Sequence, residues 1–145
     1  MNNITDRIMV IRPRPGLGSG QIDFLHLNAD GSEQMVYSHV FPKGDPWFKD
    51  LDSLVRSVAE AEVITAALDF DGVYSLDSTS LMDLVRLSQT IEADGGRLAL
   101  VNLHPRVKGI LEVTQLDRFF QMFASLETGV AFLGSRDPVT GGKND

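Results

Sequence analysis

One stretch of the sequence, residues 63–81, constrains the fold more than any other. It begins with the apolar run 63–68, which is typical of a strand buried on both faces of a sheet. The chain then turns at Asp71-Gly72 and reaches Asp77-Ser78-Thr79-Ser80 just before a helical pattern starts. Because the N–H groups at a helix N-terminus point outward and the helix dipole favours negative charge there, these hydroxyl groups are well placed to carry or contact a phosphate.

The composition limits the class of protein and of partner. With 145 residues the chain is long enough for one domain with its own core. It has no cysteine, which excludes disulfides, thiolate catalysis and cysteine-bound metals. A net charge of −7 without a basic stripe argues against nucleic acid as a partner. No apolar run approaches the roughly 20 residues of a membrane span, and the N-terminus does not resemble a signal peptide. We therefore expect a cytoplasmic protein that contacts no membrane and binds a protein or a small molecule.

The first part of the chain is predicted to form an extension and a β-hairpin. Residues 1–20 hold a short apolar piece followed by two prolines and three glycines. We interpret them as an N-terminal extension with a loop over 12–20. Strand-like runs at 22–27 and 33–41 flank a turn-rich Asp-Gly segment, which indicates an antiparallel hairpin. Asp45-Pro46 then opens an amphipathic helix.

The second part of the chain alternates strands and helices. A strand at 63–70 precedes a helix that ends at Asp94-Gly95-Gly96, and the later elements are a strand at 98–103, a helix from His104-Pro105, a strand at 119–123 and a helical segment at 126–133. This order predicts an α/β domain over residues 21–134, with a mixed sheet of four to five strands and about four helices. The sheet begins with the hairpin and has parallel strands in its second half. Residues 135–145 are predicted to be a flexible tail.

Two carboxylates in the central stretch suggest an enzymatic alternative. The segment Leu68-Asp69-Phe70-Asp71-Gly72-Val73 resembles the Asp-x-Asp-Gly motif of haloacid-dehalogenase-type phosphatases. In that family the first aspartate attacks phosphorus, the second is the acid/base, and Mg²⁺ binds both. This chain lacks the late acidic pair of those enzymes, and its only lysines after Asp69 are Lys108 and Lys143. The alternative interpretation is structural. In it, Asp69 and Asp71 are polar residues at the end of a buried strand, and one of them forms a hydrogen bond with the turn backbone.

A longer series of motifs resembles the STAS domain of bacterial anti-sigma factor antagonists. The family has an apolar strand with an Asp-containing turn, then Asp-Ser-Ser/Thr-Gly-Leu at the start of a helix with a Gly-rich end. A strand with Asn, a Pro-containing helix and a Thr/Gly-Leu turn follow. This chain carries the same order between residues 63 and 133, in the segments 68–73, 77–81, 94–98, 100–102, 104–107 and 111–117. The resemblance implies a STAS-like α/β fold.

The resemblance also implies partner switching. In such proteins the serine after the aspartate is phosphorylated by a serine-kinase anti-sigma factor of the GHKL type, and a PP2C-type phosphatase restores the free serine. The unmodified protein binds the kinase, which then releases its client. Carried over to this sequence, the phosphoacceptor is Ser78, and the implied partner-binding residues are Asp77, Thr79, Ser80, Met82 and Arg86. The protein itself would be non-enzymatic, with no catalytic residue, no metal and no cofactor.

Several alternatives stay open. Ser80 stands where the family has glycine and Met82 replaces a usually small residue, which favours a different or dedicated partner. Ser78 also fits an ordinary N-cap role without any modification. Another alternative keeps the fold and drops the switch, giving a constitutive binding subunit of a stressosome or of a transporter-associated complex. The oligomeric state is open as well, a dimer included.

Overall fold

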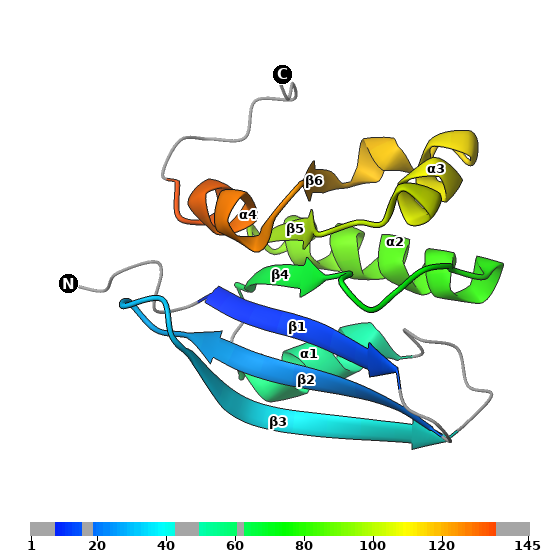
Figure 1. Ribbon diagram of the computed structural model, residues 1–145. Helices are drawn as coiled ribbons and strands as arrows, with labels where there is room; N and C mark the ends of the chain where they lie inside the picture. Colours follow the sequence, from blue (N-terminus) through cyan, green and yellow to red (C-terminus); the bar gives the residue numbers. More distant parts are fainter. Residues whose placement is uncertain (1–7, 16–18, 43–49, 61–62, 136–145) are drawn as a thin grey trace.

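Six strands form one mixed sheet in the part of the chain that the structure describes (Figure 1). The computed structural model describes residues 8–15, 19–42, 50–60 and 63–135. The order of strands across the sheet is β3-β2-β1-β4-β5-β6. In chain order the elements are β1 (Ile8–Pro15), β2 (Ser19–Leu27), β3 (Glu33–Pro42), α1 (Leu51–Ala59), β4 (Thr65–Asp69), α2 (Ser78–Ala93), β5 (Arg97–Val101), α3 (Pro105–Val113), the short 3-10 helix η2 (Asp117–Phe119), β6 (Gln121–Phe123) and α4 (Leu126–Leu133).

The pairing of the strands confirms the predicted hairpin and the parallel second half. β2 pairs antiparallel with β3, whereas β4, β5 and β6 are parallel neighbours. β1 joins the two halves, because it pairs antiparallel with β2 and parallel with β4. The observed architecture is therefore the predicted α/β arrangement of a mixed sheet and helices.

β1 is the main difference from the predicted architecture. The sequence predicts an extension and a loop here, whereas Ile8, Val10 and Ile11 are fully buried in the sheet. Pairing with β4 covers only residues 8–11, so no described strand pairs with residues 12–15 on that side of β1. Proline lacks an N–H group and is accepted in a strand at such a position, which explains why the two prolines do not end β1. With β1 included, the described residues form a sheet of six strands instead of the predicted four to five.

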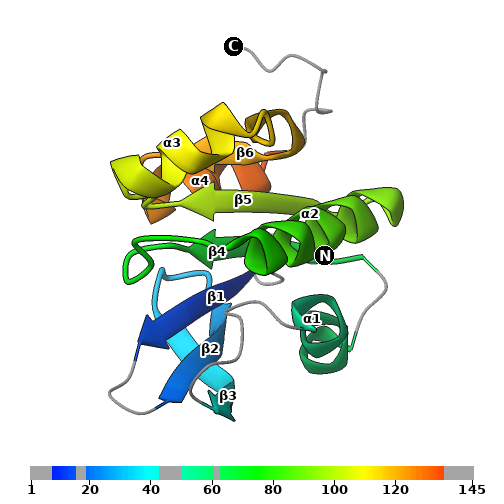
Figure 2. The same cartoon turned by 90° about the vertical axis from the view of Figure 1, so that its right-hand side faces the viewer.

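Each face of the sheet has its own apolar core. One core combines Ala66 and Leu68 of β4 with buried residues of α1, α2 and α3. The other combines Ala67 of β4 with Leu133 of α4. Helices α1, α2 and α3 therefore cover one face, and α4 covers the other (Figure 2). This arrangement confirms that β4 and β5 are buried on both faces, because helices lie above and below them.

Some predicted features lie outside the described residues. α1 begins at Leu51, after Asp50 with a left-handed φ of 57°. The predicted helix start at Asp45-Pro46 lies outside the described residues, as does the predicted tail from residue 136 onward. Among the helices of the described segments, none has the length and apolar composition that crossing a membrane requires.

The turn from α2 to β5 depends on two glycines, as the sequence predicts. Gly95 has a φ of 88°, a left-handed conformation that residues with a Cβ rarely adopt. The N–H groups of Gly95 and Gly96 donate to the carbonyls of Glu92 and Ile91 at 3.0 and 2.9 Å and close the end of α2. At Gly96 the constraint is space, because an added Cβ would lie 2.1 Å from the carbonyl oxygen of Ile64.

We predict that Gly96→Ala lowers the free energy of unfolding by about 1–3 kcal/mol, because overpacking forces the backbone of Ile64 to move. Gly109→Ala is the matched control. An added Cβ at Gly109, inside α3, has no neighbour within 4 Å, so alanine should stabilise the protein by about 0.5–1 kcal/mol. Urea unfolding followed by circular dichroism measures both effects. Equal effects of the two substitutions would contradict the close approach at Gly96.

Candidate functional site

The buried carboxylate of Asp69 closes β4 and is 4% exposed. Oδ2 of Asp69 accepts a hydrogen bond from Nε of Arg12 on β1 at 2.8 Å. Oδ1 accepts two more, from the backbone N–H of Asp71 and from Nδ2 of Asn102, each at 3.0 Å. Both carboxylate oxygens are therefore engaged by donors of the protein itself. This geometry fits the structural interpretation of Asp69 and gives no support to a nucleophile that attacks phosphorus.

Arg12 extends this contact to the hairpin. Its Nη1 and Nη2 atoms donate to the two carboxylate oxygens of Glu33 at 2.7 and 2.9 Å, a bidentate arrangement. The hydrogen bonds from Arg12 lower the pKa of Glu33 below its ordinary value of 4.5, and burial opposes this shift only in part. Arg12 thus joins β3 to the end of β4 through two ion pairs.

The loop between β4 and α2 is held by backbone and apolar contacts. The N–H of Phe70 donates to the carbonyl of Val101, and the N–H of Val73 donates to the carbonyl of Phe70, both at 2.9 Å. Phe70, Val73 and Leu76 are buried in the core, whereas Tyr74 between them is exposed. The loop therefore delivers the chain to the start of α2 in a defined position.

Asp77, rather than Ser78, is the N-cap of α2. Its carboxylate accepts from the backbone N–H of Ser80 at 2.8 Å, and its carbonyl accepts from the N–H of Leu81 at 3.0 Å. The N-cap interpretation of Ser78 is therefore wrong, because the preceding aspartate fills this role. Ser78 is the first helical residue, and it is exposed like its neighbours Asp77 and Thr79. Within the described part of the chain, the Ser78 hydroxyl forms no hydrogen bond.

The other predicted site residues of α2 divide between surface and core. Met82 is 55% exposed, and the side chain of Arg86 is 66% exposed. Ser78, Met82 and Arg86 follow one another at intervals of four and lie on one face of the helix, which we call the α2 strip. Ser80 is only 1% exposed, so the predicted contact of Ser80 with a partner does not fit this structure. It lies four residues before the buried Leu84, on the face of α2 that packs against the sheet.

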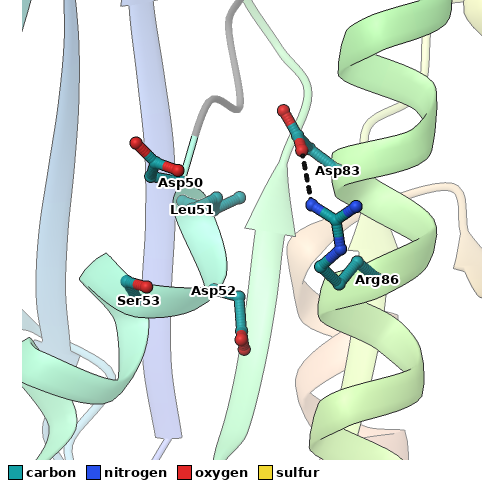
Figure 3. A pocket seen from close by; sticks show the side chains of 6 residues that line it. All are labelled: Asp50, Leu51, Asp52, Ser53, Asp83 and Arg86. Carbon is teal, nitrogen blue, oxygen red and sulfur yellow. Dashed lines mark hydrogen bonds and ion pairs between the residues drawn. The ribbon is translucent and has the colours of Figure 1, made fainter.

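A small hollow lies beside the α2 strip, between α2 and the start of α1 (Figure 3). Within it Nη1 of Arg86 pairs with Oδ1 of Asp83 at 3.2 Å. Burial raises the pKa of Asp83, Arg86 opposes this shift, and the nearby charges of Asp50 and Asp77 reinforce it. The α2 strip therefore adjoins an acidic surface to which α1 contributes. The lining residues are Asp50, Leu51, Asp52, Ser53, Asp83 and Arg86.

Comparison with known protein families identifies the family of this chain. The family model of the STAS domain matches residues 4–129 of the chain, a range that includes β1. The chain belongs to the STAS domain family. No curated protein sequence matches it significantly.

Two solved structures, from Thermotoga maritima and Planctomyces limnophilus, share their fold with this STAS domain. A crystal structure of a candidate anti-sigma factor antagonist from Thermotoga maritima has 24% sequence identity and a TM-score of 0.50, over 57% of this chain and 72% of that one. An anti-sigma factor antagonist (STAS) domain protein from Planctomyces limnophilus has 22% identity and a TM-score of 0.54, over 61% of this chain and 78% of that one. These likenesses confirm the STAS-like α/β fold that the sequence predicts.

One aromatic pair of this STAS domain, formed by the exposed Tyr74 and the half-buried His104, was not identified from the sequence. Tyr74 is 58% exposed, and its ring meets the ring of His104 edge-on at a centroid distance of 5.1 Å. Nδ1 of His104 accepts from the N–H of Arg106 at 3.1 Å and caps α3. Both aromatic residues follow parallel strands, β4 and β5, whose carboxyl ends meet at one edge of the sheet. Sites form at this edge in α/β folds, so the shared edge is the signal that could have identified the pair.

We predict that Arg12→Ala lowers the free energy of unfolding by about 3 kcal/mol, the lower end of the cost when a buried ion pair loses one partner. Asp69 would stay buried without its guanidinium partner, whose own side chain is 21% exposed. Arg86→Ala is the control, because the Arg86 side chain is largely exposed and such surface pairs contribute about 0–1 kcal/mol. Urea unfolding at neutral pH measures both values, and equal losses would contradict the scaffold role of Arg12.

Lowering the pH should reduce the difference in the free energy of unfolding between the wild type and Arg12→Ala. The pKa of Glu33 is lowered in the folded state, so the stability that Glu33 contributes is present above its ordinary value of 4.5 and is lost as the pH falls through the lowered value. The variant lacks this contribution at every pH. Unfolding curves recorded at neutral pH and at several values below 4.5 test this, and a difference independent of pH would contradict it.

Proposed function

We propose that this STAS domain is a non-enzymatic anti-sigma factor antagonist of the cytoplasm that is switched by phosphorylation of Ser78. Its unmodified form binds a serine-kinase anti-sigma factor of the GHKL type, and a PP2C-type phosphatase restores this form after phosphorylation. The observation that carries the proposal is the position of Ser78, the exposed first residue of α2 next to the capping Asp77. Membership of the STAS family and the names of the two structural relatives support it.

A phosphate on Ser78 is compatible with the fold. The modification adds a charge of about −1.5 to −2, and the N-terminus of a helix tolerates negative charge because of its dipole. The N-cap hydrogen bond is made by Asp77, so the phosphate does not replace it. Within the described residues the Ser78 hydroxyl has no hydrogen bond to lose. Helix α2 should therefore remain intact after phosphorylation.

The same phosphate would change the surface that a partner meets. Met82 lies one turn after Ser78 and is 55% exposed, so a partner that covers Met82 must also desolvate the phosphate. Asp77 and Asp83 already make this end of α2 acidic, and further negative charge repels an acidic partner surface. Phosphorylation would thus weaken binding through local charge, without unfolding the domain.

The two departures from the family pattern have different consequences for this proposal. Ser80 is buried, so a serine in place of the family glycine leaves the outer surface of α2 unchanged. Met82 does alter that surface, because its flexible and polarizable side chain suits an apolar pocket of a dedicated partner. We therefore propose Asp77, Thr79, Met82 and Arg86 as the contacts around Ser78.

A constitutive binding subunit of a larger complex is the second candidate function. The α2 strip is exposed without any modification, so it could serve as a permanent contact in a stressosome or a transporter-associated complex. A phosphatase that uses Asp69 is not proposed, because that carboxylate is buried and accepts hydrogen bonds from three donors. Whether binding responds to charge at Ser78 separates the switch from the constitutive subunit.

We predict that Ser78→Asp weakens binding to the cognate GHKL-type kinase by at least about tenfold, whereas Ser78→Ala binds like the wild type. Calorimetry with the kinases of the host measures the affinities, and mass spectrometry of the protein isolated from its host shows whether Ser78 carries phosphate. Ser75→Asp is the matched control, because it places the same charge in the exposed loop before α2.

The outcomes separate the two candidate functions. If Ser78→Asp and Ser78→Ala bind equally tightly, the switch is wrong and the constitutive subunit is favoured. If Ser75→Asp weakens binding as much as Ser78→Asp, added negative charge acts wherever it lies near α2, and the assignment of Ser78 as the switch is wrong. The variant Thr79→Ala should still be phosphorylated, because the predicted acceptor is Ser78, the residue that directly follows Asp77.

A further inference from the structure

Strand β3 forms one edge of the sheet and has exposed apolar side chains (Figure 1). It has 10 residues and pairs with β2 on one side, while no described strand pairs with its other side. Four large apolar side chains on it are exposed by 44–60%, namely Met35, Val36, Tyr37 and Val40. An unpaired strand edge offers a row of free N–H and C=O groups to another strand.

The apolar side chains of β3 lie on both faces of the sheet. Tyr37 is opposite Phe24, which belongs to the core beneath α1, and Phe41 packs against the same core. Met35 is opposite Leu25, which belongs to the core on the α4 side of the sheet. Apolar residues on both faces are typical of an internal strand, whereas edge strands are usually protected by charged residues, above all lysine. The composition of β3 is therefore that of a strand with neighbours on both sides.

The charge of β3 favours a second copy of this chain as that neighbour. Glu33 is the only acidic or basic residue of β3 apart from His39, and both of its carboxylate oxygens are bound by Arg12. Residues 34–38 and 40–42 carry no charge, although the whole chain has a net charge of −7. Identical acidic molecules repel one another wherever charged surfaces meet, so an uncharged strip suits contact between two copies.

We propose that β3 pairs antiparallel with β3 of a second copy, so that two six-stranded sheets join into one. An edge strand is complementary to itself in this arrangement, because a two-fold axis brings its donors to the acceptors of the copy. The pairing with β2 is regular from Tyr37 to Pro42, beyond the register shift between Phe24 and Leu25. Pro42 has no N–H group to offer to a new strand, which leaves residues 37–41 as the segment that can pair. A two-fold axis at His39, the centre of this segment, places Tyr37 opposite Phe41 of the copy. The row of Tyr37, His39 and Phe41 rings, with centroids 6.4 Å apart, would then continue across the interface.

This contact would leave the Ser78 surface open. β2 and β1 separate β3 from β4, the strand that leads to α2, so β3 and β4 are about 14 Å apart at the usual strand spacing. The inference does not depend on the proposed switch. A dimer would present two Ser78 surfaces.

We predict that the wild type dimerises and that Val40→Lys raises its dimer dissociation constant at least about tenfold, because two ammonium groups would enter the interface. Val40 is 60% exposed, so the variant should fold like the wild type, which circular dichroism and thermal unfolding verify. Val113→Lys is the matched control, because Val113 is 84% exposed at the end of α3, away from β3. Sedimentation equilibrium measures the masses. A wild type that stays monomeric up to its solubility limit, or a folded Val40→Lys that dimerises equally well, would overturn the proposal.

Cysteine cross-linking tests the position of the axis, because the chain has no cysteine of its own. Residues that face each other across an antiparallel pair have Cβ atoms about 4.5–5.5 Å apart, close to what a disulfide needs. Oxidised His39→Cys should therefore form a covalent dimer, whereas Val113→Cys should not. Equal cross-linking of the two variants would overturn the pairing. Ser78→Asp should leave the dimer unchanged, so a failure of the switch and a failure of the dimer are told apart.

Discussion

The buried carboxylate of Asp69 is the contact on which the candidate site depends. It joins Arg12 of β1, Asn102 after β5 and the N–H of Asp71 at the start of the loop to α2. Hydrogen bonds to an ionised group are short and strong, and a buried carboxylate without them would cost several kcal/mol. The middle of β1 is therefore held to the ends of β4 and β5, and the loop that reaches Ser78 starts from fixed atoms. The scaffold of the site does not use Ser78 itself.

A residue that is modified reversibly should be one whose hydroxyl the fold does not need. Ser78 meets this condition, because Asp77 supplies the cap and the Ser78 side chain is exposed. Ser88 on the same helix does not, because it is 2% exposed and its hydroxyl donates to the carbonyl of Phe119 at 2.9 Å. A phosphate on Ser88 would break a buried hydrogen bond and open the core, whereas on Ser78 it adds charge to a surface.

The fold was predictable where its signals are local. The Asp-Gly turn between β2 and β3 and the glycines after α2 act through their immediate neighbours. β1 was not predictable in this way, because its prolines indicate a loop and only pairing with β2 and β4 overrides them. Asp77 and Ser78 are both good capping residues, so the residue types alone do not decide which of them caps α2. Ser80 was expected at the surface because a family motif does not show which way a helix faces.

The two surfaces proposed for contact with other proteins use charge in opposite ways. The start of α2 is acidic, and the proposed phosphorylation of Ser78 would add further negative charge there, so binding to this surface could be adjusted. β3 is nearly free of charge, and β2 and β1 lie between it and the phosphate, so a contact through β3 should not respond to the modification. In a homodimer joined through β3, phosphorylation of one copy would leave the other able to bind. The amount of bound kinase would then fall in two steps, as first one and then the other Ser78 of the dimer is phosphorylated.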